Sequence, residues 1–119
     1  MNIVYLQLGS NLGDREQFIT HAVQEVEEYV GCVNNRSQIY ESTPWRVEGQ
    51  ENYLNQIIEV KTAFSAEDIL ARILKIENDL GRVRLEKWGE RLIDIDIIFF
   101  NNDIIETPNL CIPHKHMHE

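Results

Sequence analysis

The chain has 119 residues, 43% of them hydrophobic and 26% charged, and its formal net charge is −9. This length is typical of one domain with a modest core, and the acidic balance argues against general binding to nucleic acids or anionic membrane surfaces. The two cysteines, Cys32 and Cys111, lack metal-ligand spacing and are typical of reduced thiols. With no leader segment and no run of membrane-spanning length, residues 1–119 are expected to form a single cytoplasmic domain.

The first half of the chain predicts a strand, a helix and a second strand. Residues 3–8 are rich in β-branched and aromatic side chains and lead into a cluster of turn formers at 9–14. This turn lacks the Lys-Ser/Thr ending of a P-loop, so a plain strand-to-helix turn is favoured over a phosphate site. The apolar stripe that follows predicts a helix closed by Gly31 in a left-handed cap; its members are Phe18, Ile19, Ala22, Val23, Val26 and Val30. A strand is then predicted within 32–41, most clearly at 37–40.

The second half repeats the strand and helix pattern. A strand is predicted at 53–62, in which Tyr53 and Asn55 share one face and the apolar residues occupy the other. A helix then begins after Ser65, which is placed to cap it, and ends at Gly81; its apolar stripe is Ile69, Ile73, Ile76 and Leu80. With a last strand at the Asp-containing run, the order β-α-β-β-α-β predicts an α+β, ferredoxin-like fold. Its antiparallel sheet would carry both helices on one face and place strands one and four in the interior.

The last predicted strand carries two carboxylates in an otherwise apolar run. Asp94 and Asp96 point to the same face because side chains alternate along a strand, which places them roughly 6–7 Å apart. The apolar residues at 95–100 are typical of a central strand. Buried carboxylates need cations or hydrogen-bond donors, and Mg²⁺ carrying a phosphate substrate is one solution. An edge strand with a solvated acidic face is the other interpretation.

A basic cluster precedes the Asp pair. It holds four of the chain's 11 basic residues, namely Arg82, Arg84, Lys87 and Arg91. In an acidic chain, such a cluster beside two carboxylates indicates a site for a polyanion carried with metal, although a solvated basic loop fits equally well. The tail 101–119 is polar and turn-rich. Its three alternating histidines, from His114 to His118, lack a fourth partner at zinc-binding spacing, which disfavours zinc.

Four short segments occur in the same order as in a known family. They are residues 82–97, with Arg-Val-Arg and Lys-Trp-Gly-Glu-Arg-Leu-Ile-Asp-Ile-Asp-Ile, residues 8–13, Tyr53-Leu54-Asn55, and Pro113-His114 with Met117. Together they resemble the hydroxymethyldihydropterin pyrophosphokinase family of folate biosynthesis, over essentially the whole chain. The resemblance implies transfer of the β,γ-pyrophosphoryl group of ATP to the hydroxymethyl group of a reduced pterin, with release of AMP.

The resemblance also implies roles for individual residues. Asp94 and Asp96 would hold two Mg²⁺ ions, and Arg82 and Arg91 would act with them as catalytic residues that neutralise phosphate charge. The implied ATP-binding residues are Glu77, Arg82, Arg84, Trp88, Arg91 and His114. The implied pterin-binding residues are Ser42, Thr43, Trp45, Tyr53 and Asn55. Read without the resemblance, Glu77 could equally be a helix-surface charge.

Two other functions fit the sequence pattern. One is a non-catalytic ferredoxin-like module that binds a small ligand or RNA, although exposed aromatic residues on the central strands are few. The other is a palm-type, Mg²⁺-dependent nucleotide enzyme, which would release cyclic product or pyrophosphate rather than AMP. Members of the resembled family usually continue past the equivalent of Glu119 with a further strand and helix. The domain at 1–119 is therefore expected to lack that segment.

Overall fold

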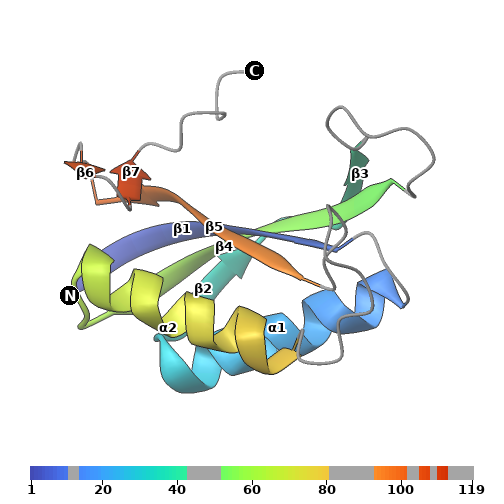
Figure 1. Cartoon of the computed structure of the whole chain (residues 1–119), viewed down its shortest axis with the longest axis horizontal. Coiled ribbons are helices and arrows are strands. Elements are labelled where there is room, and N and C mark those ends of the chain that lie inside the picture. Colours follow the sequence, from blue (N-terminus) through green and yellow to red (C-terminus); the bar gives the residue numbers. More distant parts are fainter. Residues whose placement is uncertain (11–13, 43–51, 81–92, 102–104, 108–109, 113–119) are drawn as a thin grey trace.

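The computed structural model describes residues 1–10, 14–42, 52–80, 93–101, 105–107 and 110–112. A five-stranded antiparallel sheet lies over two helices, which occupy the same face (Figure 1). The elements are β1 (Asn2–Ser10), α1 (Arg15–Tyr29), β2 (Cys32–Arg36), β3 (Tyr40–Ser42), β4 (Tyr53–Thr62), α2 (Ala66–Leu80) and β5 (Asp94–Phe100). The strand order is β2-β4-β1-β5, and β3 pairs with β4 as well. The predicted ferredoxin-like fold is confirmed.

The core lies between the helices and the sheet face that covers them. Both predicted helical stripes enter it, and from α1 and α2 the buried residues are Ile19, Ala22, Val23, Val26, Ala66, Ile69, Ile73 and Ile76. The strands contribute Val4, Leu6, Leu8, Ile58, Val60, Ile95 and Ile97. Burial of one Leu or Ile side chain stabilises the fold by about 1.5–3 kcal/mol. The opposite sheet face is mixed: beside polar residues such as Gln7 and Glu59 it carries the rings of Tyr5 and Phe99, whose centroids are 6.3 Å apart. Neither described helix is long and apolar enough to cross a membrane.

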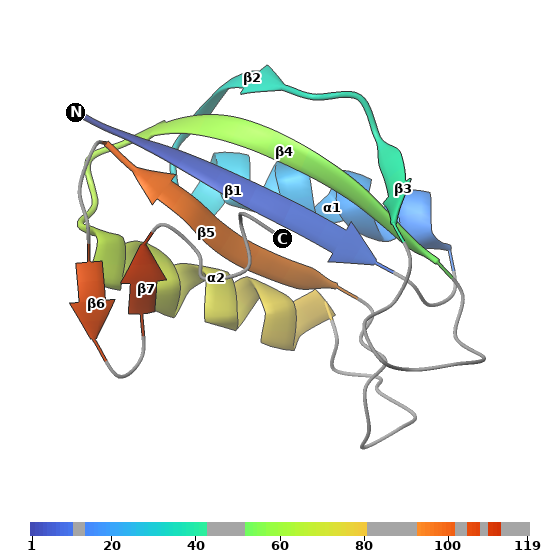
Figure 2. The same cartoon turned by 90° about the horizontal axis from the view of Figure 1, so that it is seen from above.

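The prediction that the Asp-containing strand is central was wrong. Among the described strands, β5 ends the order, beside the central β1 (Figure 2). The apolar run at 95–100 misled the prediction, and it contains a β-bulge. Tyr5 pairs with Phe99 and Leu6 pairs with Ile97, so Ile98 has no partner in the β1 register. The consecutive residues Ile97 and Ile98 are both buried, but of the two only Ile97 belongs to the described core cluster. An edge strand with a bulge thus has the apolar run that a central strand would show.

Of the two predicted helix caps, Ser65 at the start of α2 is confirmed and the left-handed cap at Gly31 is not. Ser65 Oγ accepts a hydrogen bond from the Asp68 N–H at 3.2 Å, which confirms it as the cap of α2. At the end of α1, however, Gly31 does not adopt the left-handed conformation. It is needed for space instead, because a Cβ at this position would lie 2.1 Å from the Lys61 carbonyl oxygen of β4.

The second predicted strand is split. Residues 37–39, where the signal was clearest, separate β2 from β3. Ser37 explains the interruption, since its Oγ accepts the Ile57 N–H at 2.9 Å while its own N–H donates to the Ile57 carbonyl at 2.8 Å. A side-chain hydroxyl thus replaces the backbone acceptor of a regular ladder.

The tail is more ordered than its composition suggested. β6 (Ile105–Thr107) and β7 (Leu110–Ile112) pair as a separate antiparallel hairpin, which the prediction of a polar, turn-rich tail missed. The hairpin lies at the opposite end of the molecule from β3 (Figures 1 and 2).

Candidate functional site

Three strands bring predicted site residues together on the sheet face that points away from the helices. In the register, Gly9 of β1 pairs with Asn55 of β4 on one side and with Asp94 of β5 on the other. Gln7 lies one step along the same face, opposite Asp96. Adjacent strands are about 4.8 Å apart, so a single glycine separates the predicted pterin side from the predicted metal side.

Gly9 provides the space that this arrangement needs. A Cβ at this position would lie 2.9 Å from Asn55 Oδ1 and 3.4 Å from Tyr53 Cδ1. The Asn55 amide and the Tyr53 ring can therefore lie close over the β1 backbone only because residue 9 has no side chain.

Tyr53 connects the two halves of the site. Its Oη donates to Asp94 Oδ2 at 3.4 Å, which is long for an O–H···O hydrogen bond. The predicted pterin-binding tyrosine and the first predicted metal ligand are thus in direct contact, although they are 41 positions apart in the sequence.

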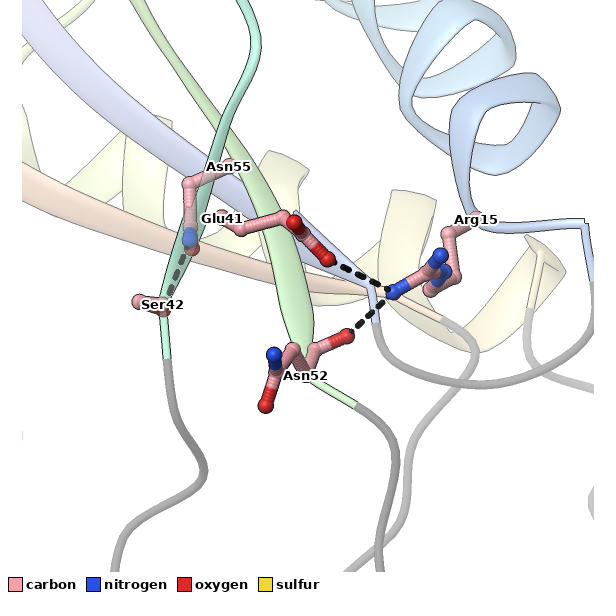
Figure 3. A network of polar contacts seen from close by, with 5 residues as sticks. All are labelled: Arg15, Glu41, Ser42, Asn52 and Asn55. Carbon is pink, nitrogen blue, oxygen red and sulfur yellow. Dashed lines mark hydrogen bonds and ion pairs between the residues drawn. The ribbon is translucent and has the colours of Figure 1, made fainter.

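The Asn55 side chain is held in one orientation (Figure 3). It is 4% exposed, and its Nδ2 donates to Ser42 Oγ of β3 at 2.8 Å. On the other side, Gln7 Nε2 donates to its Oδ1 at 3.5 Å. A buried amide needs such partners, and these contacts fix which atoms Asn55 presents to a ligand.

The two aspartates differ in exposure. Asp94 is half-buried and Asp96 is exposed, whereas the alternating Ile95 and Ile97 enter the core, so the predicted shared face is confirmed. Among the described residues, no three or more His, Cys, Asp or Glu side chains gather as a metal cluster. A carboxylate pair still suits Mg²⁺, which is typically bound through one or two carboxylates together with waters and substrate phosphates.

Glu77 is not simply a charge on the helix surface. Its Oε2 accepts the backbone N–H of Ile95 at 2.6 Å, so α2 is bonded to β5 between the two aspartates. A hydrogen bond to a charged acceptor is stronger than one between neutral groups. Glu77 therefore holds the strand that carries Asp94 and Asp96, a contact that the sequence did not indicate.

The remaining predicted site residues lie outside the described residues: Thr43, Trp45, Arg82, Arg84, Trp88, Arg91 and His114. Sequence reasoning also missed two described residues of the site. Gln7 could have been found, because strand alternation places it on the same face as Gly9. Arg15, at the start of α1, gave no signal, since its partners belong to distant strands.

Comparisons with known proteins agree with this arrangement. The family model for 7,8-dihydro-6-hydroxymethylpterin-pyrophosphokinase (HPPK) matches residues 5–119. A Bacillus subtilis (strain 168) protein named 2-amino-4-hydroxy-6-hydroxymethyldihydropteridine pyrophosphokinase is 42% identical over 119 residues, which cover 99% of this chain and 71% of the relative. A protein of the same name from Aquifex aeolicus (strain VF5) is 41% identical over 114 residues, or 96% of this chain and 71% of the relative.

Solved structures show the same fold at lower identity. Plasmodium falciparum HPPK-DHPS has a TM-score of 0.68 at 20% identity, and the match covers 87% of this chain and 30% of that one. An HPPK-DHPS in complex with substrates has a TM-score of 0.72 at 17% identity, over 96% of this chain and 39% of that one. The family model covers residues 5–119 and the two relatives are 42% and 41% identical, so the chain belongs to the 7,8-dihydro-6-hydroxymethylpterin-pyrophosphokinase family.

Proposed function

We propose that the chain transfers the pyrophosphoryl group of ATP to 6-hydroxymethyl-7,8-dihydropterin in folate biosynthesis, giving AMP and the pterin diphosphate. The family match and the relatives at 42% and 41% identity support the reaction. The structural observation that carries the proposal is the contact between Tyr53 Oη and Asp94 Oδ2 at 3.4 Å. The contact joins the Tyr53 ring, which is suited to stacking on a flat heterocycle, to the Asp94 carboxylate, which is suited to binding a cation that carries phosphate.

We assign the pterin to the β4 side of the site. Its amide-like edge requires a paired donor and acceptor, which an asparagine supplies. Asn55 is buried and held by Ser42 and Gln7, so little conformational entropy is lost when it binds a ligand. Tyr53 offers an aromatic ring beside it, and Thr43 and Trp45 are the further residues proposed for this side.

We assign the nucleotide to the β5 side. Asp94 and Asp96 would hold two Mg²⁺ ions, which when bound would neutralise phosphate oxygens of ATP. Glu77 holds the backbone between these carboxylates, and Arg82 and Arg91 are proposed to balance the charge that develops on the phosphates. Arg84, Trp88 and His114 complete the proposed ATP-binding set.

The test is incubation of the chain with Mg-ATP and 6-hydroxymethyl-7,8-dihydropterin. AMP and the pterin diphosphate should form in equal amounts, as measured by anion-exchange chromatography. Release of ADP, or of pyrophosphate with a cyclic nucleotide, would contradict the proposal.

Matched carboxylate variants test the metal assignment. Asp94→Asn and Asp96→Asn should lose the heat of Mg-ATP binding in titration calorimetry while keeping the melting temperature, because an amide binds Mg²⁺ more weakly than a carboxylate does. Asp68→Asn, an exposed substitution in the first turn of α2, is the control. Equal binding heats in all three variants would contradict the assignment.

A further inference from the structure

Arg15 connects the start of α1 to two strands of the pterin side (Figure 3). Its Nη1 donates to the backbone carbonyl of Asn52 at 2.7 Å and lies 3.7 Å from Glu41 Oε2. These partners are 11 positions apart in the sequence, but one guanidinium reaches both. Figure 3 shows one guanidinium nitrogen facing both the Glu41 carboxylate and the Asn52 carbonyl oxygen.

Each partner of Arg15 directly precedes a residue of the proposed pterin site. Glu41 comes before Ser42 at the end of β3, and Asn52 comes before Tyr53 at the start of β4. In the register, Ser42 pairs with Tyr53. Arg15 thus holds the backbone directly before Tyr53 and also lies near the side chain of the residue directly before Ser42.

The two contacts differ in strength. The Glu41 side chain is 58% exposed, and an exposed ion pair at 3.7 Å is weak. The Arg15 side chain is only 26% exposed, and its bond to the Asn52 carbonyl is short and charge-assisted. The backbone contact with Asn52 is therefore the main one, and loss of Arg15 would leave that carbonyl without this donor.

We propose that Arg15 is a positioning residue of the pterin site, which acts mainly by fixing the start of β4 through Asn52, with a weaker contact to the end of β3 through Glu41. The inference rests on the proposed function, because it assumes that Ser42, Tyr53 and Asn55 bind the pterin. It concerns mainly the pterin side. The described contacts of Arg15 reach β5 only indirectly, through the 3.4 Å contact of Tyr53 with Asp94, so nucleotide affinity should depend on Arg15 less than pterin affinity does.

The chain offers a matched control at the other end of α1. Arg72 Nη1 also donates to a backbone carbonyl, that of Tyr29, at 2.8 Å, and its guanidinium lies 3.7 Å from the centroid of the Phe64 ring. Arg72→Ala therefore removes the same kind of hydrogen bond, together with a cation–π contact, away from the site. It measures what a purely structural loss does to ligand binding.

Binding experiments separate the two roles. The probes are 6-hydroxymethyl-7,8-dihydropterin and α,β-methylene-ATP with Mg²⁺, whose α,β bond cannot be cleaved in the transfer. In titration calorimetry, Arg15→Ala should weaken pterin binding about tenfold, equivalent to about 1.4 kcal/mol, and should change nucleotide affinity much less. Arg72→Ala should leave both affinities unchanged, and Arg15→Lys, which keeps a cationic donor, should recover part of the pterin affinity.

Amide hydrogen exchange gives a readout that needs no substrate. Exchange at residues 41–42 and 52–55 should be faster in Arg15→Ala than in the unmodified chain, but not in Arg72→Ala. Unchanged exchange there, or a pterin affinity no weaker than in Arg72→Ala, would overturn the proposal. If the unmodified chain bound no pterin, the proposed function would fail, while the exchange data would still decide whether Arg15 fixes these strand ends.

Discussion

Gly9→Ala is the most direct test of how the site is assembled. The added Cβ would lie 2.9 Å from Asn55 Oδ1, closer than unstrained contacts allow, and 3.4 Å from Tyr53 Cδ1. The β1 backbone cannot move away easily, because residue 9 is paired with Asn55 on one side and with Asp94 on the other. The Asn55 amide must move instead.

The size of the effect follows from what holds Asn55. Its displacement would strain or break the 2.8 Å hydrogen bond to Ser42, which contributes about 0.5–1.5 kcal/mol. Overpacking of this kind typically costs about 1–3 kcal/mol in total, which lowers the melting temperature of a domain of this size by about 4 °C per kcal/mol. Pterin affinity should fall by about tenfold or more, since the amide no longer presents the same atoms.

The assays are thermal unfolding and titration with 6-hydroxymethyl-7,8-dihydropterin at a temperature where the variant is folded. Gly31→Ala is the comparison, because its Cβ would lie 2.1 Å from the Lys61 carbonyl oxygen, a backbone atom at the far end of β4. It should destabilise the fold more than Gly9→Ala but leave pterin affinity unchanged. Unaltered pterin affinity in Gly9→Ala would refute the reasoning.

Three further variants test individual contacts. Glu77→Gln should keep the acceptor for the Ile95 N–H and stay near the original stability, whereas Glu77→Ala should lose about 1–3 kcal/mol in urea denaturation; equal losses would show that the charge matters rather than the hydrogen bond. Ser10→Ala should raise stability by about 1 kcal/mol, because the buried Ser10 Oγ has no hydrogen-bond partner among the described residues, and a decrease would contradict this. The hydrogen bond from Tyr5 to Glu59 raises the pKa of Tyr5 above its ordinary value of 10.0. As the pH rises past 10.0, the Tyr5 hydroxyl loses its proton in the unfolded chain before it does so in the folded chain, so the free energy of unfolding should fall with rising pH. Tyr5→Phe should flatten this alkaline decline in unfolding titrations, and an identical decline in both proteins would rule out Tyr5 as its source.

Local periodicity accounts for what the sequence predicted well. The apolar stripes of α1 and α2 repeat at helical spacing, and strand alternation placed Tyr53 with Asn55 and Asp94 with Asp96 on shared faces. These patterns show which side chains are buried, and the burial of apolar side chains is the main contribution that stabilises the fold. The extent of the domain, 1–119 without a further strand and helix, stays a prediction.

The errors arose where a single residue changes the ladder. β5 has an apolar run like that of a central strand, and this run contains the bulge at Ile98. At Ser37, the side-chain hydroxyl accepts the hydrogen bond that a backbone carbonyl would accept in a regular strand pair. The contacts between Glu77 and Ile95 and between Arg15 and Asn52 depend on how α2 and α1 lie against the sheet. Such contacts leave no periodic trace in the sequence, so they could be found only in the structure.

The position of β5 at the end of the described strand order has a consequence for solubility. A flat, apolar strand at such an edge is a template on which a second chain can add its own strand, and proteins prevent this with charges and bulges. β5 has both, in Asp94, Asp96 and the irregularity at Ile98. Carboxylates assigned to magnesium would thereby also discourage intermolecular β-pairing. Neutralising them is therefore expected to increase aggregation, so the binding defects of Asp94→Asn and Asp96→Asn are best measured on freshly purified protein.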